Sequence, residues 1–377
     1  MQKYQVGAYY FPNFHHDTRN DDWHGKNWNE WRLLQAAKPR FPGHQQPKIP
    51  LWGYEDEANP TVMAKKIDAA ADHGLTSFIF DWYWYEDGPY LNRCLDEGFL
   101  HAENNHRLKF SLMWANHDWT DIHPAQHNWK KGINTLAYGK VSPQAFYAAT
   151  EHMIKHYFCH PSYWRIDGAA YLSIYMIAGL VQSFGDVQST KNALDELRSR
   201  VRAAGCGELH LNAVVWGRQI LPGETKPANI NQLLKDLGFD SVTSYVWIHH
   251  QGLNRFPRTD YADYMKENIK DFQRFSDKYE LPYYPNVTMG WDPSPRTIQT
   301  DEYDDVGYPF TATLYNNTPK NFKTALQAAK DFMDCRNTSK ILTINAWNEW
   351  TEGSYLEPDM ENGEGYLNAI KEVYMDK

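Results

Sequence analysis

Two glutamates near the C-terminal end of the sequence are spaced so that they can act together. Glu349 and Glu352 follow the apolar segment 341–347, whose residues are typical of a buried strand. Glycosidic bond cleavage needs one neutral carboxyl group to protonate the departing oxygen and one charged group as base or nucleophile. Three residues apart at a strand end or on a first helical turn, the two side chains can face one cleft. We predict a catalytic pair; alternatively, Glu352 only caps the loop while Glu357 and Asp359 are solvated.

A catalytic pair needs a scaffold, and the sequence predicts alternating strands and helices. We count eight of each in the 377 residues, and a clear helix starts at Asn59-Pro60 and ends near Gly74. The predicted strands are 5–11, 77–82, 109–114, 169–175, 209–216, 241–247, 283–289 and 341–347. This favours an α/β fold, a single (β/α)8 TIM barrel with a long first βα loop, over an open doubly wound sheet. No G-x-G-x-x-G follows the first strand, and no linker divides residues 1–377, so we predict one catalytic domain.

Almost every predicted strand ends in aromatic or acidic residues, and in a βα barrel these ends meet at one rim. The chain holds 15 Trp and 25 Tyr, which suit a cleft for sugars; the alternative is a core rich in aromatic residues. The predicted substrate-binding residues at the rim are Tyr9, Tyr10, Asp81, Trp82, Trp84, Trp114, Asn116, His117, Asp118, Tyr245, Trp291, Asp292, Asn345, Trp347, Asn348 and Trp350. Tyr175 and Trp216 end two further strands at this rim. The long first loop adds Trp28, Glu30 and Trp31 as part of a sugar platform, and its prolines and aromatics favour an ordered cover.

Composition and charge argue against several classes of partner. The formal net charge is −9 and no Lys/Arg cluster stands out, so a nucleic-acid partner is not expected. No apolar stretch approaches the roughly 18 residues of a membrane span. The first residues lack the layout of a signal peptide, so a soluble, cytoplasmic protein is expected, or a periplasmic or exported one if a leader was removed.

Metal and thiol chemistry are not expected either. The four cysteines are far apart without a C-x-x-C pair, so we expect them to be reduced and structural. The adjacent histidines at 15–16 and 249–250 are expected to be surface or supporting groups, and H-E-x-x-H is absent. We therefore predict no metal and no cofactor. A serine nucleophile is not indicated, because G-x-S-x-G is absent.

Five ordered blocks of the sequence resemble one known family. They are YYFPNFH; NWNEW with AAKPRFPGHQQPKIP; FDWYWYEDG with MWANHDWT; YWRIDGAAYLSIY; and GWDPSPR with NAWNEWTEGSYLEPD, spread from residue 9 to residue 359. The chain thereby resembles the WbsX-like family, often labelled glycosyltransferase WbsX. Through that family it is similar to the endo-α-mannosidases of glycoside hydrolase family 99, which are (β/α)8 barrels.

The resemblance implies roles for the two glutamates. In the hydrolases the last block looks like N-E-W-H-E-G; the first Glu is proposed to deprotonate the sugar 2-hydroxyl, giving a 1,2-anhydro intermediate, and the second acts as acid and then base. These roles would fall to Glu349 and Glu352. Thr351 stands where the hydrolases have His, and His117 and Asp118 replace an expected acid-amide pair. These departures imply sugar contacts that differ from those of the mannosidases.

The sequence supports three functional hypotheses, each with an oligosaccharide or polysaccharide partner. The first is a retaining glycoside hydrolase acting on an α-linked glycan, mannan-like or from a bacterial polysaccharide. The second is a glycosyltransferase that builds a surface polysaccharide such as O-antigen or capsule, as the family label suggests. For that function the acids at 301–305 are only a weak D-x-D site, and no phosphate cradle is visible. The third is a carbohydrate-binding barrel in which the acids are idle.

Overall fold

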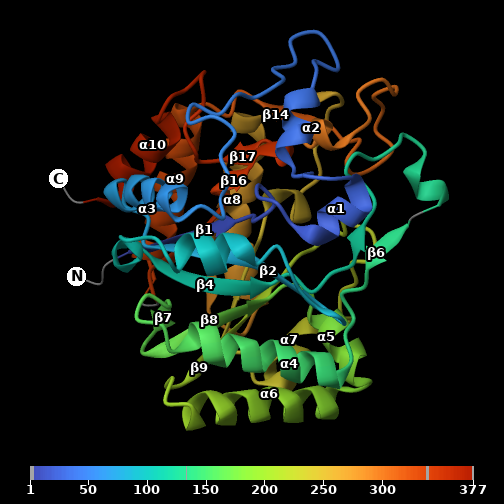
Figure 1. The fold of residues 1–377 in the computed structure, drawn as a ribbon. Coiled ribbons are helices and arrows are strands. Elements are labelled where there is room, and N and C mark those ends of the chain that lie inside the picture. Colours follow the sequence, from blue (N-terminus) through green and yellow to red (C-terminus); the bar gives the residue numbers. More distant parts are fainter. Residues whose placement is uncertain (1–3, 133, 337–338, 376–377) are drawn as a thin grey trace.

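The central sheet is a nearly closed barrel of parallel strands (Figure 1). The computed structural model describes residues 4–132, 134–336 and 339–375. The barrel strands are β1 (Gln5–Tyr10), β2 (Ser77–Tyr85), β4 (Lys109–Trp114), β8 (Ala169–Ile174), β9 (Leu209–Val214), β10 (Ser241–Thr243), β12 (Tyr283–Tyr284), β13 (Asn286–Thr288) and β15 (Ile341–Asn345). They pair in the order β12-β10-β9-β8-β4-β2-β1-β15-β13, and every pair along this path is parallel. The predicted α/β barrel is confirmed.

The barrel closes at a proline. The seventh predicted strand, 283–289, is divided into β12 and β13 by Pro285. Proline has no backbone N–H to donate, which interrupts a ladder. As a result β12 pairs with β10 on one side and β13 pairs with β15 on the other. One short segment of chain therefore supplies both edges at the point of closure.

Helices surround the barrel, with α3, α4 and α6 visible outside the strands in Figure 1. The helices that follow barrel strands are α3 (Pro60–Asp72), α4 (Pro143–Met153), α5 (Ile177–Phe184), α6 (Val187–Ala203), α7 (Ile230–Leu237), α8 (Tyr261–Lys278), α9 (Pro319–Asp334) and α10 (Gly365–Tyr374). Two helices start where local capping predicts. Asn59 accepts a hydrogen bond from Thr61 N at 2.9 Å, and Ser142 accepts one from Ala145 N at 3.1 Å, each directly before a proline at the first helical position. No helix of the described part is both long and apolar enough to cross a membrane.

The expected strict alternation of eight strands with eight α-helices is wrong at two crossovers: two α-helices, α5 and α6, stand between β8 and β9, and the described residues between β2 and β4 form no α-helix. Between β2 and β4 the chain forms a π-helix (Cys94–Phe99) and a 3-10 helix (Asn105–Arg107). A Cβ added at Gly98 would lie 2.2 Å from the carbonyl oxygen of Glu57, so the backbone here approaches the first βα loop closely. The segment that departs from a regular α-helix is therefore packed closely against that loop.

Short additional elements decorate the loops. The strands are β3 (Gly88–Tyr90), β5 (Trp119–Thr120), β6 (Thr135–Ala137), β7 (Arg165–Ile166), β11 (Arg258–Asp260), β14 (Thr313–Tyr315), β16 (Asn348–Glu349) and β17 (Ser354–Tyr355). The helical turns are the π-helix Ile154–Phe158 and the 3-10 helices Trp129–Lys131, Trp247–His249, Ser294–Arg296 and Trp350–Glu352. Glu349 and Glu352 thus end a two-residue strand and a 3-10 turn, respectively, directly after β15.

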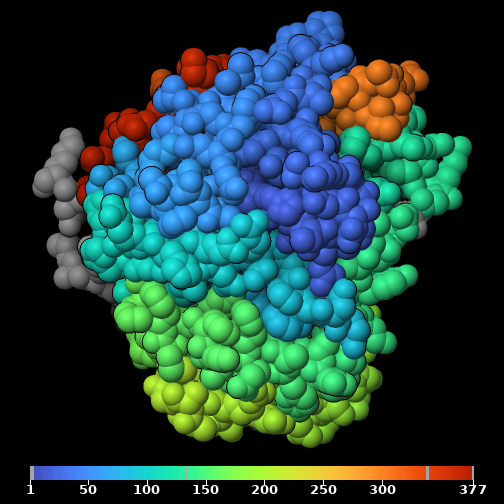
Figure 2. Space-filling model, in the orientation of Figure 1, coloured from blue at the N-terminus to red at the C-terminus, as the bar shows by residue number. Residues whose placement is uncertain are grey.

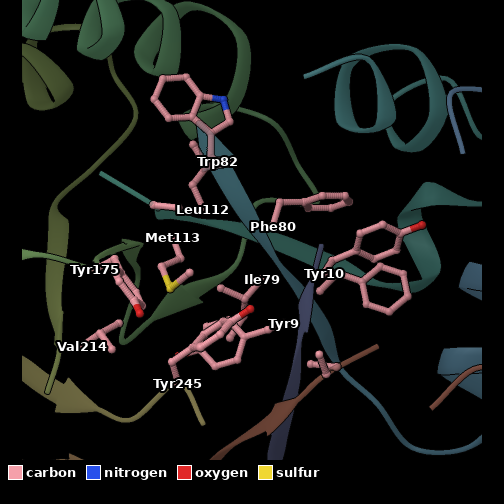
Figure 3. Close-up of a cluster of buried hydrophobic side chains, with 14 of the residues drawn as sticks. Tyr9, Tyr10, Ile79, Phe80, Trp82, Leu112, Met113, Tyr175, Val214 and Tyr245 are labelled. Atoms are coloured by element: carbon pink, nitrogen blue, oxygen red, sulfur yellow. The ribbon is translucent and has the colours of Figure 1, made fainter. Parts of the chain in front are cut away.

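Side chains of the barrel strands alternate between two aromatic layers (Figure 3). Tyr9, Ile79 and Tyr245 gather on one side of the strands, and Tyr10 and Phe80 lie on the other. The ring centroids of Tyr9 and Tyr245 are 4.7 Å apart, whereas Tyr10 stacks on Phe80 at 4.7 Å. This alternation follows from the period of two in a strand. Consecutive residues at one strand end therefore face different surroundings.

The first βα loop, residues 11–59, is an ordered cover, as its prolines and aromatics predict. It contains α1 (Thr18–His24) and α2 (Trp31–Ala36). Its later part is tied to the loop near residue 300, since Arg40 Nη2 donates to Asp301 O at 2.7 Å and Lys38 N to Gln299 Oε1 at 3.0 Å. Figure 2 shows the two segments as adjoining blue and orange surfaces.

The expectation that all four cysteines are reduced is wrong. Cys159 and Cys206 form a disulfide with Cα atoms 4.7 Å apart. Their separation of 47 residues carries no sequence motif, but successive βα units bring the two loops together at the same end of the barrel. Cys94 is buried and Cys335 exposed, and both are free.

Candidate active site

A pocket partly open to solvent lies at the carboxyl ends of the barrel strands. We call it the central pocket. Its lining includes Phe11 after β1, Ala115 after β4, Tyr175 after β8 and Tyr245 after β10, so several strands contribute to it. Functional sites of βα barrels lie at this face.

One buried arginine joins the two candidate catalytic glutamates. Arg296 is 5% exposed and ends the 3-10 helix Ser294–Arg296. Its Nη2 donates to Glu349 Oε2 at 3.1 Å, and its Nη1 donates to Glu352 Oε1 at 2.5 Å. The Tyr308 hydroxyl donates to the same oxygen of Glu352 at 2.6 Å. Because a guanidinium is planar with donors in fixed directions, Arg296 sets the positions of both carboxyl groups.

A third glutamate lies behind Arg296. Arg296 Nε donates to Glu30 Oε1 at 2.7 Å, and the Thr351 hydroxyl donates to the same oxygen. Asn13 Nδ2 donates to Glu30 Oε2 at 2.8 Å. Glu30 is fully buried and is not part of the pocket lining. The structure therefore places this predicted platform residue as a support of Arg296.

A tyrosine hydroxyl connects Glu349 to a further acid. Tyr245 Oη lies 2.8 Å from Asp81 Oδ2 and 3.2 Å from Glu349 Oε1. All three side chains line the central pocket. Asp81 Oδ1 is buried and has no hydrogen-bond partner among the described residues. The pocket thus holds two carboxyl groups that are connected through the hydroxyl of Tyr245.

The pocket is acidic, and two of its acids, Glu349 and Asp81, resist ionisation. Burial raises the pKa of Glu349 well above its ordinary value, with the charge of Glu352 adding to the rise and Arg296 opposing it. Burial also raises the pKa of Asp81, against the hydrogen bond from Tyr245. Among the described lining residues, Arg296 is the one lysine or arginine. Perturbed acids in a cleft are typical of functional sites.

Two lining histidines are neutral. Burial lowers the pKa of His117, and it lowers the pKa of His123 well below the ordinary value. They therefore add hydrogen-bonding capacity and not charge. Across the described residues, no group of three or more His, Cys, Asp or Glu side chains is arranged to hold a metal ion.

A buried ion network holds the glutamate segment from behind. Lys66 Nζ lies 2.6 Å from Glu57 Oε1 and 2.6 Å from Glu357 Oε1. The indole nitrogens of Trp347 and Trp350 donate to Glu357 at 2.9 and 2.6 Å. Burial raises the pKa of Glu57 to about 7, against the opposing charge of Lys66. The two tryptophans of the NAWNEW block are therefore anchors of the segment.

The alternative in which the downstream acids are solvated is wrong. Glu357 is 3% and Asp359 1% exposed. Asp359 accepts from the Tyr355 hydroxyl at 2.8 Å and from Glu361 N at 2.9 Å. Both acids organise the loop that follows the catalytic candidates.

The loop after β9 is fastened by a buried glutamate. Glu224 Oε1 accepts from the Tyr175 hydroxyl at 2.5 Å and lies 3.3 Å from His249 Nε2, while Oε2 accepts from Leu221 N at 3.1 Å. Burial acts to raise the pKa of Glu224, but the His249 imidazole and these hydrogen bonds lower it to about 2. Because Tyr175 and Leu221 line the central pocket, Glu224 shapes one of its walls.

The structure brings only part of the predicted set into the pocket lining. The predicted residues that line it are Asp81, His117, Asp118, Tyr245, Glu349 and Glu352, together with Tyr175, which was expected at the rim. Trp82, Trp84 and Trp114 lie on the outer side of the strands. Trp82 and Trp84 stack with centroids 5.4 Å apart, and Trp114 stacks on Phe146 of α4 at 5.7 Å. These tryptophans pack the barrel against its helices.

Other predicted residues lie outside the lining. They are Tyr9, Tyr10, Trp28, Trp31, Asn116, Trp291, Asp292, Asn345, Trp347, Asn348 and Trp350. Asn116 binds both backbone groups of Met176, at 2.9 and 2.7 Å. Asp292 Oδ2 accepts from His44 at 2.8 Å and from Gln46 at 2.7 Å, which ties the first βα loop to the rim. Trp216, which also ends a strand, lies outside as well.

Several lining residues were not predicted from the sequence. They are Phe11, Tyr83, Met113, Ala115, Trp119, Thr120, Ile122, His123, Leu221, Arg296 and Tyr308. Tyr83 could have been found, because it lies two residues after Asp81 and so shares its face of the strand. Arg296 and Tyr308 lie on a long loop, where no periodicity indicates direction.

Fold and pocket together define a (β/α)8 barrel with paired carboxyl groups at the carboxyl ends of its strands. The chain matches the family described as Glycosyltransferase WbsX over residues 6–370, and it belongs to that family. The resemblance seen in the sequence blocks is confirmed. Two curated relatives, both named "Uncharacterized protein WxcX" and from two strains of Xanthomonas campestris pv. campestris, are 28% identical over 380 residues. The match covers 97% of this chain and 49% of theirs, so the chain spans about half the length of these relatives.

Solved structures with a similar fold are glycoside hydrolases or resemble them. The GH99 endo-alpha-mannosidase from Bacteroides thetaiotaomicron aligns with a TM-score of 0.59 at 14% identity, over 99% of this chain and 97% of that one. A structure described as a glycoside hydrolase-like protein aligns with a TM-score of 0.62 at 15% identity, over 100% and 95%. At these identities the likeness is one of fold.

Proposed function

We propose that this chain is a glycoside hydrolase that cleaves an α-linked glycan, mannan-like or from a bacterial polysaccharide, with retention of configuration. The observation that carries the proposal is that Glu349 and Glu352 line one pocket and are both bound by Arg296. A pair of carboxyl groups facing one sugar is what glycosidic cleavage requires. The likeness of fold to glycoside hydrolases supports the proposal.

The two glutamates divide the work in this proposal. Glu352 gives a proton to the departing glycosidic oxygen while Glu349 takes the proton of the 2-hydroxyl. The 2-oxygen then displaces the leaving group at the anomeric carbon, forming a 1,2-anhydro sugar. Water then opens this ring and loses a proton to Glu352. Glu349 returns its proton to the 2-oxygen. A carboxylate with a raised pKa is the stronger base, which suits Glu349 to the first step.

The charge of the pocket favours a neutral or basic sugar at the cleavage point. Asp81, Asp118, Glu349 and Glu352 all line it, with Arg296 as the one lysine or arginine among the described lining residues. An anionic sugar would meet the negative charge of Glu349 in a site of low dielectric, which is unfavourable.

A glycosyltransferase that builds a surface polysaccharide is the second candidate, favoured by the name of the family. A nucleotide-sugar donor would bring a diphosphate to the pocket. The guanidinium of Arg296 is already bound to three carboxylates, those of Glu30, Glu349 and Glu352. Binding of a diphosphate there would require displacing them, which supports the hydrolase over the transferase.

Product analysis on a broad glycan panel, without and with nucleotide sugars and Mn²⁺, tests the proposal. We expect shorter saccharides from the wild-type protein without any donor. Glu349→Gln and Glu352→Gln should each lower the rate about 10²- to 10⁴-fold, the usual contribution of an acid or base. The exposed Glu103→Gln variant serves as matched control. Products that lengthen only with a donor would establish the transferase, and saturable glycan binding without turnover would indicate a binding protein.

A further inference from the structure

Asp81 is a pocket acid without an ionic partner. It lies within β2, is 3% exposed, and its Oδ2 lies 2.8 Å from the Tyr245 hydroxyl oxygen. The ion pairs of Arg296 go to Glu30, Glu349 and Glu352, and the described residues place no lysine or arginine in ion-pair contact with Asp81. A buried carboxylate without a cation is strongly unfavourable, so such a group usually takes up a proton.

The groups facing Asp81 do not supply a compensating charge. Tyr9 of β1, Tyr83 of β2, and Tyr175 and Tyr245 after β8 and β10 surround it, and each is a neutral phenol. The acidic groups nearest to it are Glu352 and, through Tyr245, Glu349. Two neighbouring acids make ionisation of Asp81 still less favourable.

The phenol between the two acids imposes a proton count. Tyr245 has one hydrogen and therefore cannot donate to Asp81 and Glu349 at the same time. If both acids are charged, one faces the phenol oxygen without a hydrogen bond. If one acid is protonated, it donates to the phenol oxygen, and the phenol donates to the other acid. One proton thus gives hydrogen bonds to both acids and to the phenol between them.

The position of Arg296 decides which acid holds this proton. Arg296 Nη2 is bonded to Glu349 Oε2, whereas Asp81 has only the phenol. We propose that Asp81 is a positioning residue that holds the proton and, through Tyr245, keeps Glu349 charged and oriented. Asp81 Oδ2–H then donates to Tyr245, Tyr245 donates to Glu349 Oε1, and Arg296 donates to Glu349 Oε2. The inference rests on the proposed function only in that Glu349 is the group being prepared as a base.

The free oxygen of Asp81 has a place in this arrangement. With the proton on Oδ2, Oδ1 is a buried carbonyl oxygen without a hydrogen-bond partner among the described residues. A neutral carbonyl oxygen that lacks a hydrogen bond costs less than a charged carboxylate oxygen in the same place, which also favours the proton on Asp81.

Infrared difference spectroscopy of the free protein tests the proton assignment. We compare the stretching band of protonated carboxyl groups at about neutral pH in wild type, Asp81→Asn and Glu349→Gln. The inference expects the variant Asp81→Asn to lose one such band and Glu349→Gln to keep it. Persistence of the band in Asp81→Asn, or its loss in Glu349→Gln, would overturn the assignment. No substrate is needed, so this result is independent of whether the proposed function is correct.

A pH profile then tests the effect on Glu349. In Asp81→Asn the amide donates to Tyr245 permanently, as protonated Asp81 does, so activity and the acid limb should stay close to those of wild type. In Asp81→Leu the donor is absent, and kcat should fall about tenfold, the equivalent of one hydrogen bond, with the acid limb moved to higher pH. Equal losses in both variants with unchanged pH profiles would show a structural role alone and refute the inference.

Discussion

The side-chain amide of Asn348 is hydrogen-bonded to both backbone groups of Phe11. Asn348 Oδ1 accepts from Phe11 N at 2.8 Å, and Nδ2 donates to Phe11 O at 2.7 Å. Asn348 directly precedes Glu349, and Phe11 lines the central pocket just after β1. The amide therefore joins the end of the first strand to the segment after the last one, much as a strand pair would.

Asn348→Ala should destabilise the protein and misplace Glu349. The variant leaves the N–H and C=O of Phe11 without their partner, and each buried unsatisfied group costs about 1–3 kcal/mol. We expect the free energy of unfolding to fall by about 2–5 kcal/mol in urea denaturation. Asn368→Ala, at an exposed position of α10, is the matched control and should leave stability nearly unchanged. A small effect for Asn348→Ala would show that the amide contacts do not hold the segment.

Glu349→Gln should make the protein more stable at alkaline pH. Because burial raises the pKa of Glu349, the folded protein loses this proton at a higher pH than the unfolded chain, so the free energy of unfolding falls from pH 4.5 up to the pH at which Glu349 ionises in the folded protein. Glutamine cannot ionise and avoids this loss. Urea unfolding at about pH 4 and about pH 8 should show no gain at the lower pH and a clear gain at the higher. If Glu349→Gln instead became less stable than wild type as pH rises, the raised pKa of Glu349 would be contradicted.

Glu224→Gln should loosen the wall of the pocket formed by Tyr175 and Leu221. The pKa of Glu224 is lowered from 4.5 to about 2, so its charge stabilises the fold above pH 4.5, and this contribution is lost as pH falls toward 2. At about 1.4 kcal/mol per pKa unit, the variant should lose about 3 kcal/mol at neutral pH. Glu208→Gln, which removes an exposed ion pair with Arg202, should cost about 0–1 kcal/mol. Equal losses of unfolding free energy in the two variants would refute this role of Glu224.

Loss of the disulfide should lower stability without involving the pocket. Cross-links of this kind contribute about 2–4 kcal/mol by restricting the unfolded chain. We expect the Cys159→Ser/Cys206→Ser double variant to lose that amount in chemical denaturation, while Cys335→Ser changes little. Thiol titration of the native protein should find one rapidly reacting group, Cys335, because Cys94 is buried. Three rapidly reacting thiols would mean that the bond is absent.

Local patterns in the sequence were sufficient to predict the barrel. Strand and helix positions followed from apolar periodicity, and the capping residue Asn59 marked one helix start correctly. Glu349 and Glu352 were placed at the end of the eighth strand for the same reason, since the apolar run ends at 347. These features depend on neighbours in the chain, which the sequence states directly.

The direction of side chains at the rim could not be predicted in the same way. Asp81 and Trp82 are consecutive, yet Asp81 lines the pocket and Trp82 packs outside the barrel. A strand buried on both faces has apolar residues at every position, so its sequence does not show which alternate residues face inward. The predicted rim therefore mixed pocket residues with outer tryptophans.

The sequence by itself determined the order of the elements, the barrel and the acid pair, because each rests on the periodicity or chemistry of adjacent residues. Only the tertiary structure decided that Arg296 binds Glu30, Glu349 and Glu352, that Tyr245 bridges Asp81 to Glu349, and that Cys159 meets Cys206. These contacts join residues between 47 and 266 positions apart. Closure of the barrel brings them together, and no local pattern in the chain encodes that meeting.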